Sequence, residues 1–105
     1  MSLSTRSQIS LVAYARQPLN THVPCLLALS EGALTVRTDA LLSPEEPVDV
    51  TLYFVEADQE TRISAEVVWV NEQLGDMALR FVSVSPSGEA LIAEYLDQRA
   101  QAQKE

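Results

Sequence analysis

The sequence predicts an all-β domain in which six antiparallel strands close into a small barrel, followed by a C-terminal α-helix. Three observations carry this prediction. Apolar and polar residues alternate with a period of two over most of the chain, which is the strand pattern. The period becomes helical after Ser85. Six short strands with one apolar face each are buried most economically when they close into a barrel filled by side chains.

Six segments carry the strand pattern. The clearest is 48–55, where apolar residues occupy every even position up to 54. Pro24 makes the second segment less regular, because proline cannot donate to a strand ladder. Polar residues at 57–60 and the Gly75-containing segment 71–76 predict hairpin connections. The predicted strands are 7–14, 22–29, 34–38, 48–55, 61–70 and 77–82.

A single helix is predicted over 86–98. Ser85 is a suitable N-cap, and Pro86 already has the φ angle that the first helical position needs. Glu89 places negative charge in the first turns, where the helix dipole favours it. The domain is therefore expected to span 5–98, with a polar C-terminal tail at 99–105. The helix has one apolar stripe, made of Leu91, Ile92, Tyr95 and Leu96.

The phase of the alternation also predicts a core. Trp69 occupies the inward phase of the longest predicted strand. Phe54, Leu79 and Phe81 occupy the same phase on neighbouring strands. We expect all four side chains to be buried.

Composition excludes several classes of protein. The 105-residue chain has seven Lys and Arg against fifteen Asp and Glu, a formal net charge of −8. So acidic a surface repels nucleic acid and anionic membranes, and no apolar run approaches the roughly 20 residues of a membrane helix. The sequence shows no signal-peptide pattern at its N-terminus. One cysteine, Cys25, and one histidine, His22, provide neither an internal disulfide nor a zinc site. We expect a cytoplasmic protein without metal or cofactor, with Cys25 buried.

Catalytic patterns are also scarce. His22 is the sole histidine that could serve as the base of a serine or cysteine nucleophile. Three glycines in the whole chain preclude a glycine-rich phosphate loop. The carboxylates of the predicted strands fall on the exposed phase. Enzymatic activity is therefore not expected.

The segment 28–34 reads Ala28-Leu29-Ser30-Glu31-Gly32-Ala33-Leu34 and taken alone is a hairpin turn, in which Gly32 could adopt a positive φ. In the context of the whole chain, this segment resembles the (Asp/Asn)-x-Ser-x-x-Gly motif that opens a strand in the PilZ family of bacterial domains. The segments 48–52 (VDVTL), 65–70 (AEVVWV) and 78–81 (ALRF) resemble later strands of that family, in the same order. The resemblance covers roughly 5–98. It implies a six-stranded antiparallel PilZ-like barrel with a C-terminal helix, in agreement with the periodicity.

Many PilZ domains bind cyclic di-GMP through an Arg-x-x-x-Arg segment and the Asp/Asn and Ser of the second motif. This chain has no Arg-x-x-x-Arg, and Ala28 and Ala33 replace two motif residues. Since a charge-assisted hydrogen bond contributes about 1.5–3 kcal/mol, loss of an arginine and the Asp/Asn would weaken binding by roughly two to four decades. A degenerate site would retain Arg6, Ser30 and Gly32. Whether Arg6, Arg37 and Arg80 cluster in space is left open by the sequence.

The resemblance therefore implies a non-catalytic regulatory adaptor that acts through contacts with a protein partner or a second copy, as in family members that work in type IV pilus biogenesis. A cyclic di-GMP receptor with a non-standard set of arginines is the alternative. A structural or unrelated small barrel is a third interpretation.

The outward phase of three hairpin-linked strands is unusually apolar, which predicts a contiguous patch. Cover by the helix or a loop is the simpler explanation of such a surface. The other hypothesis is that the single apolar stripe of the helix covers the barrel mouth, and that the patch docks a partner or a second copy. The residues of this predicted patch are Tyr53, Val55, Val68, Val70 and Val82.

Overall fold

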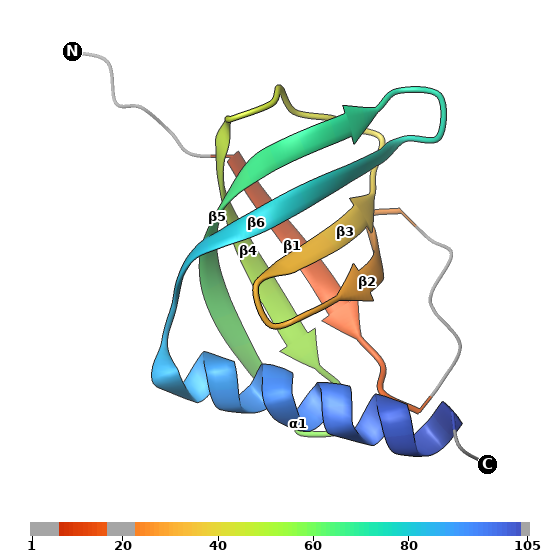
Figure 1. Ribbon diagram of the computed structural model, residues 1–105, viewed down its shortest axis with the longest axis vertical. Helices are drawn as coiled ribbons and strands as arrows, with labels where there is room; N and C mark the ends of the chain where they lie inside the picture. Colours follow the sequence, from red (N-terminus) through yellow and green to blue (C-terminus); the bar gives the residue numbers. More distant parts are fainter. Residues whose placement is uncertain (1–6, 17–22, 104–105) are drawn as a thin grey trace.

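The computed structural model describes residues 7–16 and 23–103, which form one curled six-stranded sheet and one helix (Figure 1). All six predicted strands are present, with ends that differ by up to three residues from the prediction. The elements are β1 (Ser7–Ala13), β2 (Cys25–Leu29), β3 (Ala33–Arg37), β4 (Pro47–Phe54), β5 (Gln59–Asn71), β6 (Asp76–Val84) and α1 (Pro86–Gln103).

The strand order is β1-β4-β5-β6-β3-β2, and the sheet is mixed. β1 pairs with β4 in parallel, whereas the other four ladders are antiparallel. The prediction of a purely antiparallel sheet was therefore wrong. Parallel neighbours need a long crossover connection, and here the chain between Ala13 and Pro47, which contains the β2–β3 hairpin, provides it.

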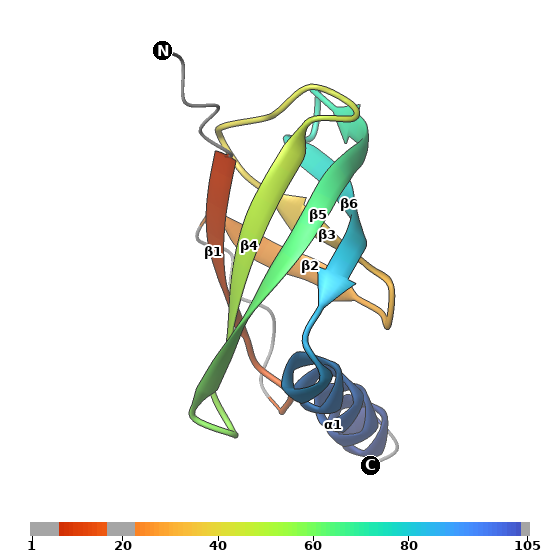
Figure 2. The same ribbon diagram turned by 90° about the vertical axis from the view of Figure 1, so that its left-hand side faces the viewer.

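The barrel is also not closed, contrary to the prediction. β1 and β2 are the two edges of the sheet, and the described residues form no ladder between them. Figure 2 shows β3 and β2 lying behind the layer β1-β4-β5, with β6 beside β5 at the right and β2 running at a steep angle to β1. Paired strands must stay about 4.7–4.9 Å apart along their length. Strands that cross steeply cannot do so, and the sheet remains a half-barrel.

The core lies between the two layers of this half-barrel. In β4 the alternation is regular, and Val48, Val50 and Leu52 are fully buried. Val36 and Leu79 contribute to the same cluster from β3 and β6. Full burial of one such side chain contributes roughly 1.5–3 kcal/mol, so the inward phase of the strands supplies most of the stabilising apolar burial.

Trp69 departs from the prediction, because 46% of its surface is exposed. A bulge in the β5–β6 ladder lies between Val67 and Trp69, and Val68 is its extra residue. An extra residue moves every later side chain to the opposite face. Trp69 therefore points outward, opposite Ala78. Strict alternation cannot reveal such a shift.

Of the other three predicted core aromatic and aliphatic residues, Phe54 and Leu79 are buried as predicted. Phe81 is only partly buried, although it packs against the core. It lies beside a second bulge, where Ser64 pairs with Ser83 and Ala65 pairs with Phe81. The free thiol of Cys25 is buried, as expected.

Helix α1 begins as predicted. The Ser85 hydroxyl accepts a hydrogen bond from the Gly88 amide at 3.0 Å, and the Ser85 carbonyl accepts one from the Glu89 amide at 2.9 Å, as an N-cap does. A Cβ at Gly88 would come within 2.3 Å of the Thr61 hydroxyl, so glycine permits this close approach of the helix to β5. The helix continues to Gln103, beyond the predicted end at 98.

The helix covers one mouth of the half-barrel and leaves the outer wall uncovered (Figure 1), as one of the two sequence-based hypotheses had it. Leu91, Ile92 and Tyr95 are buried in the common core. The rings of Tyr95 and Phe54 meet edge to face, with centroids 5.8 Å apart. Burial raises the pKa of Tyr95. The apolar stripe of the helix is therefore fully used at the mouth.

Two polar contacts connect the residues that follow β1 to the rest of the fold. The Glu56 carboxylate accepts a hydrogen bond from the Ala15 amide at 3.0 Å, and the Arg99 guanidinium donates to the Tyr14 carbonyl at 2.8 Å. Burial alone would raise the pKa of Glu56. The backbone amides of Ala15, Glu56 and Arg16 and the Arg16 charge outweigh that effect, and the pKa is lowered.

The different burial of Leu79 and Trp69 predicts that truncating these two side chains lowers the stability of the fold by different amounts. Leu79→Ala removes a fully buried side chain and should lower the free energy of unfolding by about 2–5 kcal/mol. Trp69→Ala removes a half-exposed side chain and should cost less than Leu79→Ala. Urea titrations of both variants test this, and an equal or larger loss for Trp69→Ala would mean that the indole lies in the core.

Glu56→Gln should change how stability depends on pH. A lowered folded-state pKa stabilises the fold above the ordinary value near 4.5, and this contribution is lost as the pH falls through the folded-state pKa. The variant should therefore be less stable than the wild type at pH 7, and the difference should shrink below pH 4.5. Urea titrations across this range measure it. A difference that stays constant with pH would contradict a role for the ionised carboxylate.

Candidate functional site

The turn between β2 and β3 contains the described part of the predicted ligand site. The Ser30 amide and hydroxyl both donate to the Ala33 carbonyl, at 2.8 and 3.1 Å, so the hydroxyl holds the turn. The Gly32 carbonyl accepts from the Phe81 amide at 2.9 Å. Gly32 does not use a positive φ, and a Cβ there would meet nothing within 4 Å. Arg6, the third predicted residue, lies outside the described residues.

Beside this turn, three small side chains and one indole form a row across the outer face of the sheet. Ala28 pairs with Thr35, Thr35 with Ala78, and Ala78 with Trp69. We call these four residues the outer row. A shallow hollow of about 140 Å³ lies over its first three members, and Ser30 and Ala33 also line it. The outer row offers methyl groups, one threonine hydroxyl and one indole, and no carboxylate or amide side chain.

One arginine lies on each side of the outer row, Arg37 two residues beyond Thr35 on β3 and Arg80 two residues beyond Ala78 on β6. We call these two sides the Arg37 end and the Arg80 end of the face. Arg37 is opposite Asp76 in the β3–β6 register, and its Nε and Nη2 donate to the two carboxylate oxygens at 2.7 and 3.3 Å. Asp76 is 8% exposed. Its hydrogen bond and charge raise the pKa of Arg37. Arg80, opposite Glu66 on β5, forms an ion pair with that carboxylate. Each guanidinium is therefore held by a carboxylate of the chain itself.

Of the three arginines whose clustering the sequence left open, the structure describes Arg37 and Arg80. Arg80 lies opposite Ala33, and Arg37 lies four residues further along β3 on the same face. At about 3.3 Å per residue their positions are roughly 13 Å apart. The two arginines share a face but do not converge on one point.

The predicted apolar patch is not contiguous. Tyr53 is opposite Glu60 on β5, and Val68 lies eight residues further along that strand, roughly 26 Å away. The Tyr53 hydroxyl donates to the Asp58 carboxylate. Val55 is half-buried. Val70 packs against the core, and only Val68 and Val82, at 52% and 60%, are largely exposed.

Sequence reasoning missed the apolar tip of the β5–β6 hairpin. Trp69 and Leu74 are both exposed there, in addition to Val68. The available signal was the run 67–70, which is apolar on both phases. Such a run fits a bulge, because an extra residue lets two successive side chains face outward.

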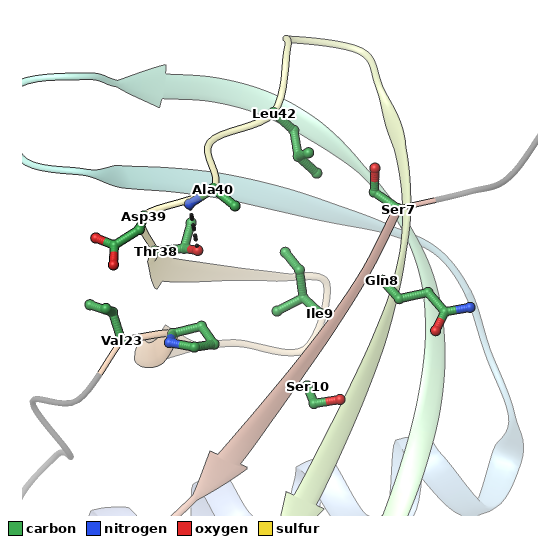
Figure 3. A pocket seen from close by; sticks show the side chains of 10 residues that line it. Ser7, Gln8, Ile9, Ser10, Val23, Thr38, Asp39, Ala40 and Leu42 are labelled. Atoms are coloured by element: carbon green, nitrogen blue, oxygen red, sulfur yellow. Dashed lines mark hydrogen bonds between the residues drawn. The ribbon is translucent and has the colours of Figure 1, made fainter.

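A larger cavity, of about 750 Å³, lies at the open seam of the half-barrel (Figure 3). Ile9 of β1 and Leu42 of the β3–β4 loop face it from opposite sides. Glu46 fastens this loop, because its carboxylate accepts hydrogen bonds from the Ser43 amide at 3.1 Å and the Ser7 hydroxyl at 2.8 Å, which lower its pKa. Among the described residues that line the cavity, Asp39 has the one ionisable side chain.

Neither region contains a pattern for catalysis or metal binding. Over residues 7–16 and 23–103, no three His, Cys, Asp or Glu side chains are grouped so that they could hold a metal ion. In that same part of the chain, no helix combines the length and apolar character needed to cross a membrane.

Comparison with known proteins agrees with this fold. The family model for the PilZ domain matches residues 4–98. A comparison with curated proteins gives no match. Because the family match spans all six strands and most of the helix, the chain belongs to the PilZ domain family.

Proposed function

We propose that this PilZ domain is a non-catalytic adaptor that regulates through contacts with other proteins and does not bind cyclic di-GMP in the way usual for its family. PilZ domains are regulatory domains that typically bind this nucleotide and act in signalling. The observation that carries the proposal is the pairing of Arg37 with Asp76 and of Arg80 with Glu66. We expect the protein to work in the bacterial cytoplasm.

The first argument concerns the charge that a cyclic dinucleotide needs. Its two phosphates and guanine edges are bound best by guanidinium groups. At Arg37, phosphate binding would compete with Asp76, a buried carboxylate that would then lose its counter-charge. Uncompensated buried charge is strongly unfavourable. The described arginines of the motif face are thus poorly placed to take up a dianion.

The second argument concerns the motif itself. Ala28 and Ala33 replace residues that would carry polar or backbone contacts to the ligand, and Ser30 uses its hydroxyl within the turn. The face that results is apolar and shallow. Exposed apolar residues adjoin it at Val68 and Trp69. Exposed apolar surface of this kind is typical of protein interaction sites.

Cyclic di-GMP should therefore give no heat of binding and no shift in melting temperature at low micromolar concentration. Isothermal calorimetry on the purified chain measures the first quantity and differential scanning fluorimetry the second. A dissociation constant below about 1 μM, roughly −8 kcal/mol, would overturn the proposal. If that binding were lost in Arg37→Ala/Arg80→Ala, the chain would instead be a receptor with a non-standard arginine set.

Two neighbouring valines should respond differently to a charge. Val68→Glu places a carboxylate on a largely exposed bulge residue, and stability should change by no more than about 0.5 kcal/mol. Val70→Glu places it opposite Met77, which is fully buried, and should strongly destabilise the fold. Thermal melts of both variants test this contrast. Unfolding of Val68→Glu would show that this surface is not available to a partner.

A further inference from the structure

We propose that the outer row docks an extended segment of a basic protein partner, in which two Lys or Arg residues flank a bulky apolar residue in the pattern basic–x–apolar–x–basic. This inference rests on the proposed adaptor function and specifies the chemistry of its partner. Three features of the described residues support it: the floor of the face, the charge at its two ends and the distance between those ends.

The hollow that forms the floor of this face has room for one apolar side chain. Ala28, Thr35 and Ala78 leave a hollow of about 140 Å³ between them, close to the roughly 150 Å³ that holds a benzene-sized group in an apolar cavity. Trp69 follows Ala78 in the same row and offers a half-exposed indole beside the hollow. A leucine or phenylalanine of the partner would bury apolar surface against both.

The Arg80 end of the face, on one side of the outer row, carries more negative than positive charge. Arg80 is matched by Glu66. Glu31, exposed in the adjoining turn, precedes Gly32, whose carbonyl accepts from the residue after Arg80. The residues at this end therefore carry one cation and two carboxylates.

The Arg37 end repeats this arrangement. Arg37 is matched by Asp76, and Asp76 pairs with Asn71 at the end of β5. Glu72, which is exposed, follows Asn71 directly. Each end therefore has a surplus of one negative charge, within a chain whose net charge is −8. Complementary cations at both ends would favour the encounter and fix the register of the partner.

The distance between the two ends selects the partner's conformation. The ends are four β3 residues apart, roughly 13 Å. In an extended segment, residues i, i+2 and i+4 face the same way, and i and i+4 are also roughly 13 Å apart. In a helix, i and i+4 are only about 6 Å apart. A second copy of this chain is disfavoured, because it would bring the same surplus of negative charge.

The test uses a random heptapeptide library displayed on phage, panned against the immobilised full chain. Enriched peptides should carry the basic–x–apolar–x–basic pattern. Trp69 is the one tryptophan of the chain, so titration with the best synthetic peptide should change its fluorescence directly. Binding should weaken as salt rises. Replacing both basic residues of the peptide by Glu should weaken it at least tenfold.

Two matched variants locate the site. Ala28→Lys fills the hollow with a long cationic side chain at an exposed position and should weaken peptide binding at least tenfold. Val12→Lys introduces the same residue at an exposed position of β1 that is not part of the outer row, and should leave binding within twofold of the wild type. Melting temperatures of both variants show that they are folded.

The outcomes separate this inference from the proposed function. Failure to enrich such peptides, or binding that Ala28→Lys does not affect, overturns the inference but not the adaptor function. A dimer in sedimentation that Ala28→Lys abolishes would assign the face to a second copy instead. Submicromolar binding of cyclic di-GMP would overturn the adaptor function itself, whatever the peptides show.

Discussion

The two-sided pairing of β5 is the constraint on which the rest of the structure depends. Its residues 59–66 pair with β4 on one edge, and its residues 63–71 pair with β6 on the other. The two bulges of the β5–β6 ladder bend these strands, since a bulge increases local twist. That bend carries β6, β3 and β2 over β4 and β1 and creates the interior (Figure 2). The same bulges turn Val68, Trp69 and Val82 outward. One local feature of the backbone thus shapes both the core and the candidate interaction surface.

Much of the fold could be predicted from the sequence, because its causes are local. Alternation in β4 reported which residues are buried, and Ser85 with Pro86 marked the start of the helix. The parallel β1–β4 pairing could not be predicted, since it depends on where a distant segment returns. The position of Trp69 was missed for a related reason. A bulge depends on the register between two strands, and neither strand encodes that register alone.

The sequence predicts which ligand-binding residues the candidate site lacks. It does not predict how the residues that are present pair with one another. The sequence shows that Ala28 and Ala33 replace motif residues, which is a matter of residue type. It does not show that Arg37 faces Asp76, because those residues lie 39 positions apart in the chain. The cross-strand partner decides whether an arginine is available to a ligand. An arginine counted from the sequence as a possible anion ligand is, in the folded chain, the counter-ion of a buried carboxylate.

The same substitutions that remove the nucleotide contacts also form the apolar floor. A polar side chain at 28 would point into the hollow beside Thr35, where Ala28 contributes only a methyl group. A polar group desolvated by a partner without a matching hydrogen bond is costly, so a face lined by alanines accepts an apolar side chain more readily than an Asp or Asn would allow. The paired arginines also favour a protein segment over a dinucleotide. Asp76 and Glu66 already balance the charge of Arg37 and Arg80 when a partner excludes water. Loss of the dinucleotide ligands and suitability for a protein segment are therefore two consequences of one set of residues.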